Sequence, residues 1–206
     1  MKSAIRKDVK ARLKTLTQQY VDEYSEIVVS KLVQLADFQS CRAFSVYLSM
    51  AGEVSTKPLL AAGFSAEKRI FIPKILGKRP EDMFMLEVGV GAVEAFPKNS
   101  WGIPEPSIEV VEAAEDGTFA GVIDFVVVPG VAFDSRCGRI GHGRGYYDSF
   151  IERVTGANLA KGGPAPRLVG LALDEQIVDL CPMEEHDRVL DVVVTPSAVY
   201  LKLHTC

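Results

Sequence analysis

The sequence predicts an α/β fold of three layers, in which a mostly parallel central sheet is flanked by helices on both faces. Two observations support this prediction. Short apolar segments rich in β-branched residues recur along the chain and suit buried strands. Segments with apolar residues at helical spacing stand before and between them. Strands that alternate with helices are typical of a parallel sheet covered on both faces.

The first half of the chain opens with two amphipathic segments. Apolar residues from Ile5 to Leu16 recur every three or four positions and predict a helix over residues 2–16. Thr17 is a suitable N-cap for a second helix that runs to about residue 36. The same patterns predict a third helix at 58–66, strands at 43–48, 69–72 and 83–88, an end to the second strand at Pro73, and a basic loop at 75–82.

The second half contains the most apolar strand, Phe125–Val128, and two further strands at 168–173 and 192–194 that complete the sheet. Two stretches have no clear period and are rich in acidic residues or in glycine, proline and alanine. We expect both of them, 97–121 and 155–166, to be surface loops.

A glycine-rich segment follows the strand at 125–128 and carries the clearest chemical signal. Pro129-Gly130 stops the strand, and glycines at 141, 143 and 145 then precede an amphipathic segment. Glycines let backbone N–H groups approach a phosphate, and a helix N-terminus adds partial positive charge. Arg139 and Arg144 can pair with phosphate oxygens, and Asp148 is a hard ligand suited to Mg²⁺. The spacing is neither a P-loop nor a Rossmann fingerprint, and a structural connector is the alternative.

The composition limits the classes of function. The chain has 206 residues, of which 48% are hydrophobic, and this length suits one domain spanning 1–206. A net charge of −4 argues against a general nucleic-acid binder, so an anionic ligand must meet a local basic cluster. No apolar run is long enough to span a membrane. We therefore expect neither nucleic acid nor a membrane as a partner, and we expect a monomer.

The cysteines point to a reducing compartment. Cys41, Cys137, Cys181 and Cys206 form no Cys-x-x-Cys pair, and they do not combine with the histidines in a zinc-finger spacing. The start of the chain lacks the apolar centre of a secretory signal. We expect reduced thiols and a cytoplasmic protein. The basic, amphipathic start keeps a mitochondrial location as the alternative, which Asp8 weakens.

Together the motifs resemble the signature of the 5-formyltetrahydrofolate cyclo-ligases, also called methenyltetrahydrofolate synthetases. Most of the likeness lies in Pro129-Gly130-x-x-Phe133-Asp134 and Gly138-Arg139-x-Gly141-x-Gly143-x-Gly145-Tyr146-Tyr147-Asp148. The other shared motifs, in family order, are Lys2-x-x-x-Arg6, Tyr47-Leu48-Ser49-Met50-x-x-Glu53, Phe71-Ile72-Pro73, Trp101-Gly102-Ile103-Pro104-Glu105-Pro106, Glu175-Gln176 and Pro182-x-x-x-x-Asp187-x-x-Leu190-Asp191. The resemblance covers nearly the whole chain and implies a fold like that of sugar-phosphate isomerases and CoA transferases.

The resemblance implies that ATP binds along the glycine segment and the N-terminal helix. The nucleotide-binding residues carried over are Lys2, Arg6, Arg139, Gly141, His142, Gly143, Arg144, Gly145, Tyr146 and Tyr147. Arg139 and Arg144 are the catalytic candidates, because they would neutralise charge on the transferred phosphate. From the residues alone, Lys2 and Arg6 also suit a solvated helix face, and the two tyrosines also suit core positions.

The resemblance further implies a folate site and a metal site. The folate-binding residues carried over are Leu48, Glu53, Trp101, His142, Gly143, Arg144, Gly145 and Tyr146. The Mg²⁺ ligands of the family match Asp148 and Asp187, and two carboxylates completed by waters and phosphate oxygens suit this ion. Taken alone, Glu53 also suits a surface position or a helix cap, and Asp187 a solvated turn. Ile75 replaces an aromatic residue of some relatives, so stacking on the folate stays open there.

The implied reaction is the ATP- and Mg²⁺-dependent cyclisation of 5-formyltetrahydrofolate to 5,10-methenyltetrahydrofolate, with release of ADP and phosphate. It would pass through an N5-iminium phosphate. The expected partners are ATP and a reduced folate, polyglutamylated or not. Two rival functions remain. One is an enzyme like a sugar-phosphate isomerase or CoA transferase, which would work without Mg-ATP, and the other is a folate- or nucleotide-binding protein without turnover.

Overall fold

The computed structural model describes residues 1–99, 102–185 and 187–203. Its centre is a seven-stranded sheet in the order β3-β2-β1-β4-β7-β8-β9. The strands are β1 (Ala43–Ser45), β2 (Arg69–Ile75), β3 (Met83–Val88), β4 (Phe125–Val128), β7 (Arg167–Leu171), β8 (Val192–Val194) and β9 (Val199–Leu201). The five inner strands run parallel, while β3 and β9 are antiparallel at the two edges. The mostly parallel sheet is therefore confirmed.

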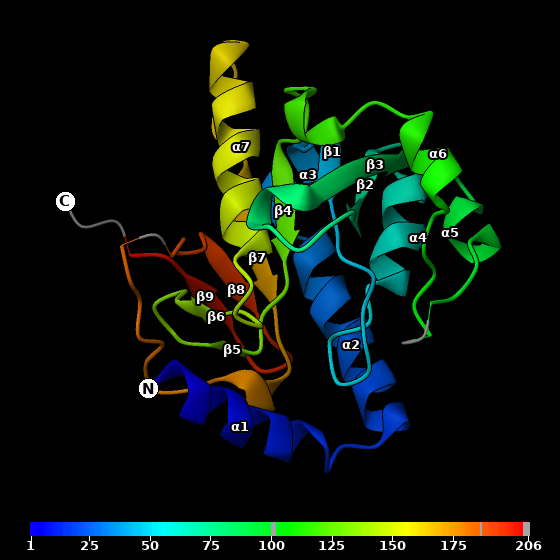
Figure 1. The fold of residues 1–206 in the computed structure, drawn as a ribbon. Coiled ribbons are helices and arrows are strands. Elements are labelled where there is room, and N and C mark those ends of the chain that lie inside the picture. Colours follow the sequence, from blue (N-terminus) through cyan, green and yellow to red (C-terminus); the bar gives the residue numbers. More distant parts are fainter. Residues whose placement is uncertain (100–101, 186, 204–206) are drawn as a thin grey trace.

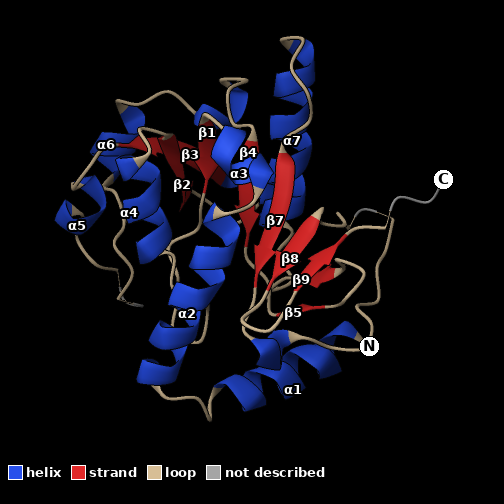
Figure 2. Ribbon diagram, turned by 180° about the vertical axis from the view of Figure 1, so that it is seen from behind, coloured by secondary structure: helices blue, strands red, loops and turns tan. Residues whose placement is uncertain are grey.

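Helices cover both faces of the sheet, as Figures 1 and 2 show. One face packs against α2 (Gln18–Val33), α3 (Ala36–Ser40) and α4 (Lys57–Ser65), and the other against α7 (Tyr146–Ala160). Alternate residues of β4 pack against the helices on the two faces of the sheet, because side chains along a strand point to opposite faces. Val127 lies in the core with α2, and Val126 lies in the core with Phe150 of α7. The expected three-layer architecture is confirmed.

The order of the strands places a crevice at one end of the sheet. The chain moves outward from β1 through α4 to β2, and it later returns to β4 on the other side of β1. In open parallel sheets, ligands bind beyond the carboxyl ends of the strands at such a reversal. The segments that leave these ends are 46–56 after β1 and 129–145 after β4. They hold most of the folate- and nucleotide-binding residues expected from the sequence.

A small hairpin and the first helix complete this end of the molecule. Strands β5 (Ala132–Phe133) and β6 (Arg139–Ile140) pair within the segment that follows β4. Helix α1 (Lys2–Leu13) packs against them through a cluster that includes Val9, Ala132 and Ile140, and Figure 1 shows α1 lying beneath the hairpin. The sequence did not predict β5 and β6, since two-residue strands carry no measurable alternation.

The N-terminal half largely follows the expected pattern, but several elements end elsewhere than predicted. Helix α1 stops at Leu13 rather than at residue 16, and β1 stops at Ser45 rather than at residue 48. The Thr17 side chain caps α2 by accepting from the Tyr20 N–H at 3.1 Å, as predicted. The predicted extension of this helix to about residue 36 was wrong, because α2 ends at Val33 and α3 begins separately. The predicted end of the second strand at Pro73 was also wrong. β2 continues to Ile75 because Pro73 lies beyond the pairing with β1, and the Met85 N–H opposite it donates to Asp116 instead.

The two predicted loops both contain helix. Residues 97–121 include α6 (Ile108–Glu112) and the 3-10 turn η2 (Gly117–Phe119). Residues 155–160 continue α7, because the buried Asn158 amide donates to the Ile123 carbonyl at 2.8 Å and ties this turn to the core. The remaining short elements are α5 (Ala92–Ala95), η1 (Pro80–Asp82) and η3 (Asp174–Gln176). Within the described ranges, none of the helices combines the length and the apolar character that crossing a membrane requires.

Candidate active site

The glycine segment adopts the shape that a phosphate loop needs. Gly143 and Gly145 have φ of +96° and +72°, a left-handed conformation that favours glycine. A Cβ at Gly143 would also lie 3.4 Å from the Arg6 guanidinium. Gly145 is the residue before α7, so this helix begins at Tyr146 as predicted. The loop therefore delivers backbone N–H groups and a helix N-terminus to one place.

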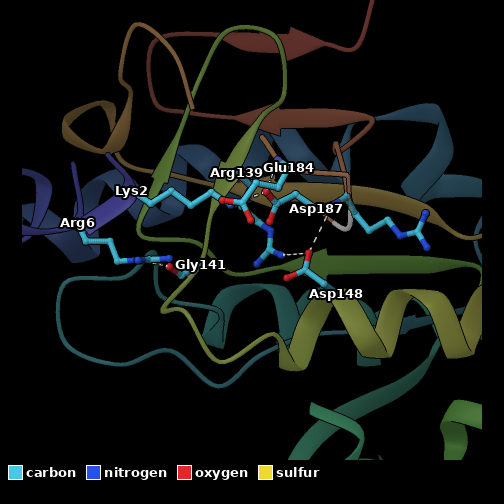
Figure 3. Close-up of polar contacts among 8 residues, drawn as sticks. Lys2, Arg6, Arg139, Gly141, Asp148, Glu184 and Asp187 are labelled. Carbon is cyan, nitrogen blue, oxygen red and sulfur yellow. Dashed lines mark hydrogen bonds and ion pairs between the residues drawn. The ribbon is translucent and has the colours of Figure 1, made fainter. Parts of the chain in front are cut away.

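Helix α1 brings two of the expected cations to this loop. The Arg6 Nε donates to the Gly141 carbonyl at 2.7 Å. One turn earlier, the Lys2 Nζ lies 2.6 Å from the Asp187 Oδ2 and 3.3 Å from the Glu184 Oε1, as Figure 3 shows. The side chain of Val9 is fully buried and fixes which face of α1 turns toward the loop. Of the two expected cations, Arg6 contacts the glycine segment directly, whereas Lys2 contacts the acidic turn that holds Asp187.

Arg139 forms a buried ion pair rather than an exposed cation. Its side chain is 5% exposed, and its Nη2 donates to the Asp148 Oδ1 at 2.6 Å. Its Nη1 donates to the Pro129 carbonyl at 3.2 Å, while its Nε has no hydrogen-bond partner among the described residues. Asp148 lies in the first turn of α7, where the helix dipole favours a negative charge. Arg139 therefore holds its charge directly behind the phosphate loop (Figure 3).

The two candidate metal ligands lie close together. The backbone N–H of Arg188, the residue after Asp187, donates to the Asp148 Oδ1 at 3.4 Å. Each aspartate is paired with a cation, Asp148 with Arg139 and Asp187 with Lys2. Within the described ranges, no group of three or more His, Cys, Asp or Glu side chains could hold a metal ion. Two hard carboxylates fit Mg²⁺ when waters and phosphate oxygens supply its other ligands.

The segment after β1 places Glu53 beside α7. The Glu53 carboxylate accepts from the Met50 N–H at 2.9 Å, and burial raises its pKa to about 7. Burial, and next the charge of Glu53, raise the pKa of Tyr147, so this tyrosine in the first turn of α7 lies near the carboxylate. Leu48 is half-buried against the core under the same segment. The segment thus offers an apolar wall and a carboxyl group close to the phosphate loop.

The rim of the site is formed by exposed or half-buried members of the loop. His142 and Arg144 are exposed. Desolvation lowers the pKa of His142, and the positive charges of Lys10, Arg6 and Arg139 lower it further. Tyr146 is half-buried, and its hydroxyl donates to the Gly77 carbonyl at 2.9 Å, which ties the loop after β2 to α7.

The structure thus gathers the expected site residues from four separate parts of the chain, except that Trp101 lies outside the described residues. Two participants were missed by the sequence analysis. Lys10 lies one helical turn beyond Arg6, so its spacing could have indicated it. Glu184, the second partner of Lys2, belongs to an acidic turn and carried no signal of its role.

Comparisons with known proteins identify the family of this chain. The model of the 5-formyltetrahydrofolate cyclo-ligase family matches residues 1–196. The probable 5-formyltetrahydrofolate cyclo-ligase of Schizosaccharomyces pombe is 33% identical over 202 residues, which cover 96% of this chain and 96% of that protein. The Mus musculus 5-formyltetrahydrofolate cyclo-ligase is 30% identical over 194 residues, which cover 94% of this chain and 92% of the mouse protein.

A solved structure extends the agreement to three dimensions. The Aquifex aeolicus 5,10-methenyltetrahydrofolate synthetase aligns with a TM-score of 0.78 and 29% sequence identity, covering 100% of this chain and 94% of its own. Sequence, fold and family match therefore converge over almost the entire length. The chain belongs to the 5-formyltetrahydrofolate cyclo-ligase family and is an enzyme of that type.

Proposed function

We propose that the protein uses ATP and Mg²⁺ to cyclise 5-formyltetrahydrofolate to 5,10-methenyltetrahydrofolate, with release of ADP and phosphate. One observation carries the nucleotide part of this proposal. Around the glycine loop at the carboxyl end of the sheet, Arg6 contacts Gly141, Lys2 pairs with Asp187, and Arg139 pairs with Asp148. Such a cluster of cations, backbone N–H groups and carboxylates can position a triphosphate and neutralise its charge.

The chemistry explains why ATP is needed. The formyl oxygen on N5 belongs to an amide-like group and is a poor leaving group. Transfer of the γ-phosphoryl group to this oxygen releases ADP and gives an N5-iminium phosphate. N10 then attacks the formyl carbon and loses its proton, and inorganic phosphate leaves. The protein mainly has to hold the two substrates in line and stabilise negative charge on the phosphate.

The residues of the phosphate loop divide this work. The N–H groups of residues 141–145 and the start of α7 bind phosphate oxygens. Arg144 is exposed on the loop and would bind the γ-phosphate, while Arg139 would supply buried positive charge next to it. Asp148 and Asp187 would hold Mg²⁺, which would neutralise charge on the triphosphate. Phosphates would then offer Lys2 and Arg139 a new anionic partner.

The segment after β1 supplies the folate side of the site. Leu48 offers an apolar wall to the pterin ring, and Glu53 accepts hydrogen bonds from its N–H and amino groups. His142, Gly143, Gly145 and Tyr146 belong to the glycine loop and the start of α7, and in this proposal they would contact both substrates.

We also propose that the enzyme acts as a monomer in the cytoplasm. Support for a monomer comes from a site whose expected residues all belong to one chain. Support for a reducing compartment comes from Cys41, Cys137 and Cys181, which are buried free thiols.

A spectrophotometric assay tests the proposed reaction. Purified protein is mixed with 5-formyltetrahydrofolate and Mg-ATP, and the near-ultraviolet absorbance of the methenyl product is followed. We expect the product to appear only when ATP is present, with one ADP formed per product, and excess EDTA to stop it. Product without ATP, or ATP hydrolysis without product, would contradict the proposal.

A further inference from the structure

A basic groove runs along α1 next to the candidate active site. It has a volume of about 470 Å³ and is lined by Arg6, Lys7, Lys10, Ala11 and Lys14. These residues share one face of the helix, because positions four apart lie one turn apart. The opposite stripe, which includes Val9 and Leu13, packs onto the body of the protein. The groove therefore has a fixed orientation toward solvent.

The lysines of the groove have no acidic partner. Lys7, Lys10 and Lys14 are exposed, and no described residue forms an ion pair with them. The carboxylate of α1 that could compete, Asp8, pairs with Arg12 at 3.1 Å. The protein carries a net charge of −4, so this uncompensated positive stripe has the opposite sign to the overall charge. It is suited to an elongated anion.

Helix α1 connects the two substrate segments of the site. Near its start, Arg6 contacts the Gly141 carbonyl of the phosphate loop at 2.7 Å. Near its end, the Leu13 Cβ lies 3.8 Å from the position that a Cβ on Gly52 would occupy, so α1 touches the segment that holds Glu53. The lysine stripe begins beside Arg6 and reaches Lys14 next to that second contact. An anion leaving the Glu53 segment would meet Lys14 and Lys10 first.

We propose that Lys7, Lys10 and Lys14 bind the carboxylates of the glutamyl tail of the folate substrate, and this inference rests on the proposed function. A folate is asymmetric, with a neutral pterin at one end and glutamate carboxylates at the other. Once the pterin lies against Glu53, the tail has to leave across the surface. Successive lysines on one helix face are about 5–6 Å apart, so each added glutamate meets a further cation.

Two other occupants suit the groove less well. A membrane surface would require the apolar face of α1, but Val9 is fully buried against the protein. In the proposed function the triphosphate binds to the glycine loop, which Arg6 contacts. Of the groove residues, only Arg6 contacts that loop through a hydrogen bond within the described part of the chain. The three lysines thus extend the site beyond the nucleotide.

Equilibrium binding without ATP tests the inference. The ligands are 5-formyltetrahydrofolate with one and with five glutamates, and the proteins are the wild type and the double variant Lys10→Gln/Lys14→Gln. We expect the wild type to bind the pentaglutamate more tightly, and the variant to lose about fivefold of that preference. The preference should also shrink as salt rises from 0.05 to about 0.5 M, because exposed charges are screened.

A matched control carries the same loss of charge elsewhere. Lys161→Gln/Lys202→Gln removes two exposed lysines outside α1 and should keep the preference for the pentaglutamate. Equal binding of both folates by the wild type, an unchanged preference in the Lys10→Gln/Lys14→Gln variant, or an equal loss in the control would each overturn the inference. None of these outcomes would contradict the proposed function, which the methenyl assay tests separately with the monoglutamate. Failure of the wild type to bind either folate would instead overturn the proposed function, and this inference with it.

Discussion

Glu53 combines a functional position with a cost to stability. Its carboxyl group is half-buried, and burial raises its pKa from 4.5 to about 7. The unfolded chain therefore loses this proton at lower pH than the folded protein does. Ionisation of Glu53 therefore lowers the free energy of unfolding. This loss of stability is absent below about pH 4.5 and grows as the pH rises toward 7. A carboxyl group that opposes folding at neutral pH is typical of a site kept for binding.

The variant Glu53→Gln isolates this penalty. Glutamine keeps an acceptor for the Met50 N–H but cannot ionise, so the variant should be more stable than the wild type at pH 8 by about 1–3 kcal/mol. At pH 4.5 the two proteins should unfold at the same temperature. Thermal unfolding of both across pH 4.5–8 measures the difference, and the same variant should raise KM for the folate. A stability difference that does not change with pH would contradict this assignment.

Arg144 is the exposed cation of the phosphate loop. Its side chain pairs with no acidic side chain of the described residues, so its loss should leave the fold intact. We expect Arg144→Ala to raise KM for ATP about tenfold or more, because a charge-assisted contact to phosphate is lost. Steady-state kinetics with ATP as the varied substrate checks this.

Arg136→Ala provides the control for Arg144→Ala. Arg136 is also exposed and lies in the same excursion after β4, at the tip of the β5–β6 hairpin away from the glycines. Its removal should leave KM for ATP within about twofold of the wild type. An unchanged KM in Arg144→Ala would remove Arg144 from the phosphate site.

At the scale of elements, one glycine precedes α7 and another lies within it, and the two have opposite roles. Gly145 precedes the helix with φ of +72°, which a side chain would strain by about 1 kcal/mol. Gly156 lies in the exposed middle of the helix with nothing within 4 Å of an added Cβ. Gly145→Ala should therefore destabilise the protein and raise KM for ATP. Gly156→Ala should stabilise it by about 0.5–1 kcal/mol.

Urea unfolding of the two alanine variants measures both effects in the same helix. Opposite signs of the change in unfolding free energy would support the loop conformation at Gly145. The same sign in both variants would show that the backbone at Gly145 relaxes and that its glycine is not required for the start of α7.

The elements that the sequence predicted well are those with local signals. The apolar run of β4, the glycines before α7 and the Thr17 cap each act within a few residues, and all three were found. The elements that it missed depend on distant contacts. The last turn of α7 is held by Asn158 and the Ile123 carbonyl, which are 35 positions apart. Strand β9 has three residues and is held by pairing with β8 and by packing of Tyr200 against the core.

In the candidate site, too, the features with local signals were predicted and those that depend on distant contacts were not. Residue types and spacing indicated the phosphate loop, and the family resemblance indicated Glu53 and Asp187. The partners within the site were not predictable, because Lys2 and Asp187 are 185 positions apart. Likewise, nothing in the sequence distinguishes a buried Arg139 paired with Asp148 from an exposed phosphate ligand. Pairing follows from the topology, which brings four segments to one end of the sheet.

At the scale of the whole molecule, the site joins the two ends of the chain. Helix α1 and the turn at 184–188 meet through the Lys2–Asp187 ion pair, in which both side chains are largely buried. The proposed metal ligands are thus neutralised by the proposed phosphate ligands. In the proposed function, ATP without metal would have to separate Lys2 from a carboxylate, whereas ATP with Mg²⁺ would give both groups a new partner. This arrangement should couple nucleotide binding to the metal.

The variant Asp187→Asn tests this coupling. Asparagine keeps an acceptor for the Glu184 N–H, which lies 2.7 Å from the Asp187 carboxylate, but it no longer holds Lys2 by charge. Calorimetry should show metal-free ATP binding several-fold more tightly than in the wild type, because Lys2 is released. Mg²⁺ should improve that binding less than it does in the wild type, since one proposed ligand is lost.

Glu184→Gln separates the release of Lys2 from the loss of a metal ligand. Glu184 also pairs with Lys2, at 3.3 Å, but its side chain is 60% exposed and it is not a proposed metal ligand. Its replacement should strengthen metal-free ATP binding only slightly and leave the effect of Mg²⁺ intact. If Asp187→Asn instead weakens ATP binding equally with and without Mg²⁺, the Lys2–Asp187 pair is a structural tie between the chain ends. The coupling would then have to arise from Arg139 and Asp148 alone.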